Sequence, residues 1–396
     1  MTAHGFPSRF IKLPQARARF GDRVDRLGAF LHEGDPLADA VVDALAPLDR
    51  PARESLVALG LARGPGAVEA QGPAGERLAV LLAHLERTPF WVDHARADRG
   101  GAAFLRAGAL GGMVLGTYSL VAGYCSPAGN KPLAFSGRLT EEAPRRLGET
   151  GRYVQAVCTP GGLRRHGEGW RASVRVRLLH ASVRRLLGRH PRWDAGCWGE
   201  PINQYDMSGT NLLFSWVVTD GLERLDAPFT AAEREDYLHL WRYAGWLMGV
   251  REELLAATAE EARTLWELVK STQGPPDEDS RGLARALLES PLAMARSAEE
   301  RRRVAWRVPF GYALSRHFIG DEYALALGYP PTGRRWRAAL WALRRAARSG
   351  TALVRALPDA DRRGVSLGLR YWDRAIQRTV PRADEAFPLA EALRRR

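Results

Sequence analysis

The sequence predicts an all-α fold, with a single large helical domain and extra helices at both ends. Apolar residues recur at helical spacing along most of the 396 residues, and no convincing strand alternation occurs over any length. An apolar fraction of 45% is ample for a core. We expect an N-terminal helical extension over 1–100, a core over 101–330 and a basic helical segment over 331–396.

The first hundred residues contain short helical patterns separated by Gly- and Pro-rich breaks at 63–66 and 71–75. The stretch 107–130 carries no charge and is long enough to cross a bilayer. Five glycines before Pro127 dilute its apolar character, however, and Pro127 closes it. We therefore expect a buried, closely packed helix here rather than a membrane span.

Three helices then follow at the centre of the chain. Thr140 caps the first, which runs to about Val157, where the sequence TPGG breaks it. The second is expected from about Arg171 to Leu187, with Gly188 as its C-cap. The third opens at Pro201 and extends to about Thr219.

The remaining chain is also helical by pattern. Thr230 and Glu233 have the spacing of a capping box for a further helix. A polar stretch with a Pro-Pro pair at 271–280 is a loop, and helices are expected over 299–327 and 333–356.

Charge and cysteine content limit the classes of function. The formal charge is +13, but nearly all of it is arginine spread along the chain between acids, so we expect no nucleic-acid partner. The three cysteines share no metal-type spacing and are expected to be reduced thiols. The first ten residues carry no signal-peptide pattern, so we expect a cytoplasmic protein.

The second central helix carries a histidine in an unusual setting. By helical spacing, Ser173, Val176, Arg177, His180, Val183, Arg184 and Leu187 share one face. A neutral imidazole on a rigid helix suits a haem iron, and arginines one turn away on each side suit the two propionates. The alternative is a core histidine on a basic helix whose arginines extend to solvent.

The two neighbouring helices carry matching faces. The first lines up Arg146, Thr150, Tyr153 and Val157, with Glu149 at the border, and the third lines up Asn203, Met207, Thr210, Phe214 and Val217. A few polar groups against apolar walls are what the distal side of a haem pocket requires. Ordinary capping and buried hydrogen bonding would give the same residue types.

The ordered motifs RRL-ET (145–150), VRLLHASVR (176–184) and PINQ-D-GT-FS (201–215) resemble the MpaB and latex clearing protein family of oxygenases, over roughly residues 103–330. The resemblance implies a helical, somewhat globin-like core and a non-covalent haem b held by His180. It also implies that the family's characteristic arginines and threonines correspond to Arg146, Thr150, Arg184 and Thr210. The family's known reactions cleave isoprenoid carbon–carbon double bonds with dioxygen.

Two departures affect what the resemblance implies. The rubber-cleaving branch has a lysine beside the motif threonine, where this chain has Glu149, so lysine ligation of iron is impossible at that position. The rubber enzymes are also exported, whereas this chain begins without an export signal. An intracellular lipid, terpenoid or polyketide side chain therefore fits better than a solid polymer.

Other candidates stay open at this stage. His317 is the best rival axial ligand, and Arg316 beside it is a further candidate partner for a propionate. Cys158 is a remote candidate for a thiolate ligand. The segment 334–348 combines two tryptophans with six arginines, and it is either a helix docked on the protein or a helix lying on a membrane surface.

Together these features predict a haem b-dependent oxygenase acting with dioxygen on an apolar, isoprenoid- or lipid-like alkene. His180 is the expected iron ligand, and Arg177, Arg184 and Arg316 are the expected propionate partners. Arg146, Glu149, Thr150 and Thr210 are the expected catalytic group. The alternatives are a peroxidase-like enzyme, a haem sensor or carrier without turnover, and a basic interaction protein without a cofactor.

Overall fold

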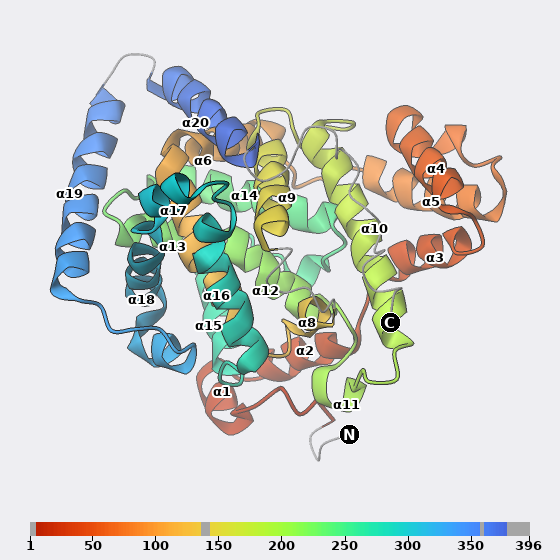
Figure 1. The fold of residues 1–396 in the computed structure, drawn as a ribbon. Coiled ribbons are helices and arrows are strands. Elements are labelled where there is room, and N and C mark those ends of the chain that lie inside the picture. Colours follow the sequence, from red (N-terminus) through yellow and green to blue (C-terminus); the bar gives the residue numbers. More distant parts are fainter. Residues whose placement is uncertain (1–4, 136–142, 357–359, 378–396) are drawn as a thin grey trace.

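The computed structural model describes residues 5–135, 143–356 and 360–377, and within these ranges every regular element is a helix (Figure 1). The all-α prediction is confirmed. The predicted cap at Thr140 lies outside the described residues.

The N-terminal extension is a set of short helices, as its Gly/Pro punctuation predicts. They are α1 (Leu13–Phe20), α2 (Arg23–Ala29), the 3-10 turn η1 (Phe30–His32), α3 (Pro36–Leu45), α4 (Arg50–Arg63), η2 (Pro65–Ala67) and α5 (Gly72–Glu86). Asp35 and Asp49 cap α3 and α4 by accepting hydrogen bonds from backbone N–H groups in the first turn. Helices α3, α4 and α5 lie together at one end of the molecule, and α3 packs against α10 (Figure 1).

The core begins with a long, broken helix and ends with a tryptophan-rich one. Its elements are α6 (His94–Val114), the π-helical turn η3 (Leu115–Ser119), α7 (Leu120–Tyr124), α8 (Lys131–Ala134), α9 (Ala143–Cys158), α10 (Glu168–Gly188), α11 (Ala195–Trp198), α12 (Gln204–Phe214), α13 (Trp216–Arg224) and α14 (Ala231–Leu247). The capping box at Thr230 and Glu233 is confirmed. The third central helix differs from expectation: it starts at Gln204 and breaks at Ser215, whose φ and ψ are −98° and −84°.

The charge-free stretch lies within a helical run from His94 to Tyr124. By length and composition this run could cross a membrane, although a core helix can meet the same criteria. In this fold α6 packs along α14 on one side and along the C-terminal helix α20 on another.

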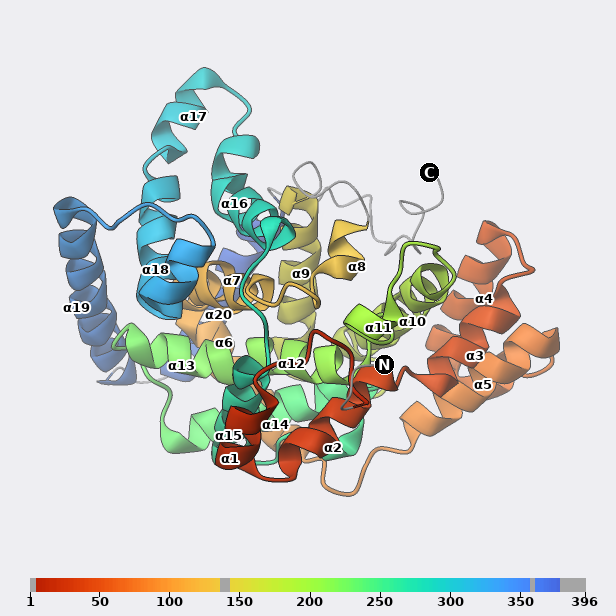
Figure 2. The same ribbon diagram turned by 90° about the horizontal axis from the view of Figure 1, so that it is seen from below.

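The C-terminal half covers the core. Its elements are η4 (Glu252–Leu254), α15 (Ala259–Ser271), α16 (Glu278–Ala293), α17 (Ala298–Val304), α18 (Arg307–Ala326), α19 (Arg334–Ala356) and α20 (Ala360–Gln377). Helix α20 packs directly against α6 and α9, and Trp372 stacks on Phe104 with ring centroids 5.6 Å apart. The approach is so close that a Cβ added at Gly368 would lie 1.8 Å from the Leu105 carbonyl oxygen. Helix α19 lies on the outside, as both views show (Figures 1 and 2).

Candidate functional site

Helices α9 and α10 form an antiparallel pair that sets the register of the site. They are joined by the short segment 159–167 and pack side by side (Figure 1). The Tyr153 hydroxyl lies 3.2 Å from the Ser173 hydroxyl oxygen, which fixes where the helices meet. Arg146 precedes Tyr153 by seven residues and His180 follows Ser173 by seven. Because a helix rises about 1.5 Å per residue, Arg146 and His180 reach the same level, about 10 Å from this contact.

His180 is held in mid-helix as a neutral imidazole. Its Nδ1 atom is buried and has no hydrogen-bond partner. Burial, together with the positive charge of Arg184, lowers the pKa of His180 to about 4. A metal ligand must be unprotonated, and a buried ring nitrogen without a partner is costly unless a bound group uses the ring. The histidine therefore fits the ligand role that the sequence predicts.

The same helix presents an incompletely covered apolar strip. Val176, Leu179, Val183 and Leu186 are all partly exposed, although α10 lies in the middle of the fold. They lie on the same side of the helix as His180, away from the contacts with α3. Such a strip is what a flat apolar group or an apolar substrate would cover.

The two arginines that flank His180 are paired with carboxylates of the N-terminal extension. Arg177 contacts both carboxylate oxygens of Asp35, at 2.6 and 2.9 Å. Arg184 binds Asp39 at 2.6 Å and donates to the Ile202 carbonyl, which leaves its buried Nε without a partner. Arg184 thus has a donor to spare for a propionate. For Arg177, the propionate role stays a prediction beside its observed role in joining α10 to α3.

Arg146 and Thr150 line one small cavity, as the shared face of α9 predicts. The cavity has a volume of about 40 Å³, and its walls are Leu120, Tyr124, Ala143, Arg146, Leu147, Thr150, Leu283 and Leu287. The walls come from α7, α9 and α16. The cavity thus combines apolar walls with three polar groups, which is the usual composition of a small-molecule binding pocket.

Glu149 does not line this cavity. Its carboxylate pairs with the Arg145 guanidinium at 2.9 Å, and both side chains are partly exposed. Arg146 is not among the described partners of Glu149. The structure thus separates Glu149 from Arg146 and Thr150, which the sequence grouped together.

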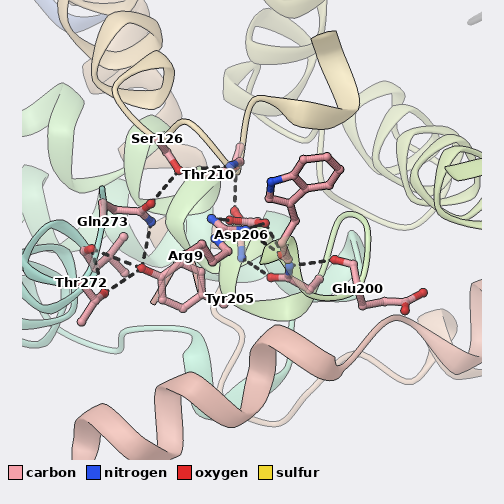
Figure 3. Close-up of polar contacts among 12 residues, drawn as sticks. Arg9, Ser126, Glu200, Tyr205, Asp206, Thr210, Thr272 and Gln273 are labelled. Carbon is pink, nitrogen blue, oxygen red and sulfur yellow. Dashed lines mark hydrogen bonds and ion pairs between the residues drawn. The ribbon is translucent and has the colours of Figure 1, made fainter. Parts of the chain in front are cut away.

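Thr210 lies on α12, in a polar network rather than beside α9. Its hydroxyl donates to the Asp206 carbonyl at 2.8 Å, and the side chain is exposed (Figure 3). The Asp206 carboxylate receives two hydrogen bonds of 2.7 Å from Arg9. Helix α12 packs against α7 and α14, and α14 packs against both α9 and α10.

The rival candidates lie elsewhere. Arg316 is bound to Asp321 and to the Tyr329 carbonyl, and His317 beside it is exposed. Both are on α18, which packs against η3, α16 and α19 rather than along the histidine helix. In both views α18 and α10 lie on opposite sides of the molecule, so the structure does not bring Arg316 to His180 (Figures 1 and 2). Burial raises the pKa of Cys158 well above its ordinary value, which disfavours a thiolate.

Sequence reasoning missed three residues of this region. Asp35 and Asp39 lie some 140 residues before their arginines, and no local pattern connects the two segments. Sequence analysis placed Tyr124 within the charge-free stretch 107–130 without giving it a role. Its hydroxyl, in an otherwise apolar segment, was the only available sign that it could line a polar cavity.

Comparisons with known proteins identify related sequences and a related fold. Residues 100–349 match the family model described as the ER-bound oxygenase mpaB/B'/Rubber oxygenase catalytic domain. The rubber oxygenase of Streptomyces sp. (strain K30) is 25% identical over 285 residues, which cover 71% of this chain and 68% of the relative. The solved structure of a latex clearing protein in the closed state matches with a TM-score of 0.61 and 22% identity, over 88% of this chain and 91% of that one.

Proposed function

The chain belongs to the family of MpaB-type and rubber oxygenases, and from this premise we propose that it is a haem b-dependent oxygenase that acts with dioxygen on an apolar alkene. The substrate class is isoprenoid or lipid-like. The rubber oxygenase relative acts, by its name, on rubber, and five of the eight described residues that line the cavity of Arg146 and Thr150 are leucine or alanine.

The observation that carries the proposal is His180. It is a neutral imidazole, its Nδ1 is buried without a partner, and it lies on an apolar strip that the described protein leaves partly uncovered. When bound, haem b supplies the redox-active iron that dioxygen chemistry requires. His180 would hold the iron, and the spare Nε of Arg184 would bind a propionate.

Arg146 and Thr150 would act on oxygen in the cavity that they line. A guanidinium stays charged, so Arg146 can stabilise negative charge that develops on an oxygen atom. The Thr150 hydroxyl can donate a hydrogen bond into the same space. Leu120, Leu147 and Leu287 give the cavity apolar walls, and polar interactions are stronger beside apolar walls than in open water.

Glu149 would take the lesser role of a charge partner on the rim. Its contact with Arg145 links residues one turn apart on α9, and such exposed pairs contribute about 0.3–0.5 kcal/mol. Glu149→Gln should therefore leave haem content and turnover near those of the parent. A large loss of rate with haem retained would instead make Glu149 a proton donor.

Aerobic turnover with labelled dioxygen tests the reaction. The purified protein is incubated with a short polyisoprenoid alkene under ¹⁸O₂, and mass spectrometry follows carbonyl products that carry the label. Arg146→Leu and Thr150→Val should slow product formation about tenfold or more while haem content stays normal. Arg145→Leu is the matched control, because Arg145 neighbours Arg146 but does not line the cavity. Haem binding without any oxygen-dependent product would favour a sensor or carrier.

A further inference from the structure

Three aromatic side chains form a row from the start of α18 to the start of α19. Trp306 lies directly before α18, and the centroid of its ring is 5.9 Å from that of Phe310. The Phe310 centroid is in turn 5.9 Å from that of Trp336, in the first turn of α19. Trp306 is 53% exposed, although an apolar ring gains free energy when it leaves water. The aromatic row (Trp306, Phe310 and Trp336) thus has an uncovered end at the surface.

Arginines without acidic partners accompany the aromatic row. Arg307 lies over the Trp306 ring at 6.0 Å, and Arg335 lies over the Trp336 ring at 4.8 Å. Neither 301–318 nor 334–356 contains an aspartate or a glutamate. In the described parts of the chain, the exposed arginines of these two stretches that form no ion pair are Arg301, Arg302, Arg307, Arg334, Arg335, Arg337, Arg345 and Arg348. The surface beside the aromatic row is therefore strongly cationic.

Helix α19 packs on the protein with one face only. Leu340 and Ala347 are buried, whereas Trp341 is 65% exposed and has Arg345 over its ring at 5.5 Å. Both views place α19 at one edge of the molecule, at the opposite end from α4 (Figures 1 and 2). The outer face of α19 is thus accessible to a partner much larger than a small molecule.

The residue types favour a lipid surface over a nucleic acid. Residues 334–348 consist only of arginine, tryptophan, alanine and leucine. Proteins that bind nucleic acids also use hydroxyl and amide side chains to contact phosphates, and this stretch has none. Tryptophan is enriched where a bilayer meets water, and arginine is attracted to anionic headgroups. An amphipathic helix of this composition is typical of proteins that lie on membranes.

We propose that the aromatic row, the arginines beside it and the outer face of α19 form a surface that docks on a bilayer of anionic phospholipid. Trp306 would enter the region between headgroups and acyl chains, and the arginines would contact lipid phosphates. The docking requires neither a bound cofactor nor turnover. Where the proposed function also holds, the bilayer would be the store from which an apolar alkene is drawn.

A fluorescent label beside the aromatic row tests the proposal. Ala305 is exposed and adjoins Trp306, so Ala305→Cys can carry a nitrobenzoxadiazole group while every residue of the surface is kept. Cys197→Ser is the background, because the other two cysteines are buried. Vesicles of phosphatidylcholine with phosphatidylglycerol should raise the emission about twofold or more and shift it to the blue, and vesicles of phosphatidylcholine alone should not. Ala58→Cys is the matched control, because Ala58 is an exposed alanine on α4, and its label should not respond.

Trp306→Ala in the labelled Ala305→Cys protein tests the row itself. Because Trp306 is largely exposed, the helical circular dichroism spectrum should not change. The lipid concentration that gives half of the emission change should rise about fivefold. An unaltered midpoint would remove the aromatic row from the surface and overturn the proposal.

Three other results would overturn it: no emission change with the anionic vesicles, equal changes at both labels, or a response to a duplex DNA fragment as large as that to vesicles. The last result would make this a nucleic-acid surface. The absorption spectrum of the same samples reports on haem separately. Vesicle docking by a colourless protein would retain the lipid surface and reject the proposed haem enzyme.

Discussion

Arg177 on α10 and Asp35 at the cap of α3 form a two-contact ion pair that is almost completely buried, with 4% and 6% of the side chains exposed. Asp35 also accepts the Ala38 N–H, so one carboxylate caps α3 and ties it to the histidine helix. A Cβ at Gly249 would lie 2.3 Å from the same carboxylate, which shows how tightly the pair is enclosed.

Breaking this pair should be costly. Arg177→Ala leaves the Asp35 carboxylate buried without a counter-charge, and we expect the free energy of unfolding to fall by about 3–5 kcal/mol. Arg185→Ala is the control, because Arg185 joins the same two helices through an exposed pair with Asp43 and should cost less than about 1 kcal/mol. Urea unfolding measures both. Equal losses in the two variants would contradict a structural role for the Arg177 pair.

Much of the fold was predictable because helix signals are local. The histidine helix, expected over 171–187, spans Glu168–Gly188, and the Thr230 capping box is present. The face of α9 that lines the cavity followed from helical spacing alone.

The missed features depend on tertiary contacts. The break at Ser215 and the carboxylate partners of Arg177 and Arg184 are set by how distant segments pack. The close packing of α20 on α6 likewise has glycine as its only signal in the sequence, for example Gly368. Composition identified 331–396 as basic but could not reveal that α20 packs against the core.

The titration of His180 makes stability depend on pH. In an unfolded chain its imidazole titrates near pH 6.5, and in the fold burial lowers its pKa to about 4. Between these values the unfolded state binds more protons, so the stabilisation present above pH 6.5 is lost as pH falls toward 4. The loss should be on the order of 2 kcal/mol in protein freed of cofactor, since partial exposure weakens the effect.

Denaturant unfolding of cofactor-free protein at pH 7.5, 6 and 5 measures this dependence. His180→Gln should flatten it, whereas His32→Gln, which removes an exposed histidine, should leave it unchanged. An unaltered pH dependence in His180→Gln would mean that the imidazole is not held neutral by the fold.

Gly368 should be essential for the docking of α20. A methyl group there would overlap the Leu105 backbone carbonyl, so Gly368→Ala should destabilise the protein by about 1–3 kcal/mol or more. Gly350→Ala, in α19, meets open space and should stabilise the helix by about 0.5–1 kcal/mol. Thermal unfolding should therefore move in opposite directions for the two substitutions. A neutral Gly368→Ala would contradict the close contact of α20 with α6.

The outer face of α19 leads to a prediction about membranes. Trp341 and Leu353 are 65% and 64% exposed, and Arg334–Ala356 contains no acidic residue. An apolar side chain among arginines favours contact with anionic lipid. Vesicles of phosphatidylcholine with phosphatidylglycerol should co-sediment the protein, and vesicles of phosphatidylcholine alone should not.

Trp341→Ala combined with Arg345→Ala should weaken this sedimentation severalfold, and so should added salt. Phe90→Ala is the matched control, because Phe90 is fully exposed but lies far along the chain, before α6. Equal sedimentation of the double variant and the parent would contradict the membrane role. Helix α19 would then serve only to pack against α18.

The absorption spectrum of the purified protein, with and without His180, tests the central claim most directly. The parent should show the Soret band of haem b. Acidified organic solvent should extract this haem, because the chain has no C-x-x-C-H motif for covalent attachment. His180→Ala should be nearly colourless, with an unchanged helical circular dichroism spectrum. The account would be contradicted if the parent were colourless after purification from cells that were supplied with haem. It would also be contradicted by a normal Soret band in His180→Ala.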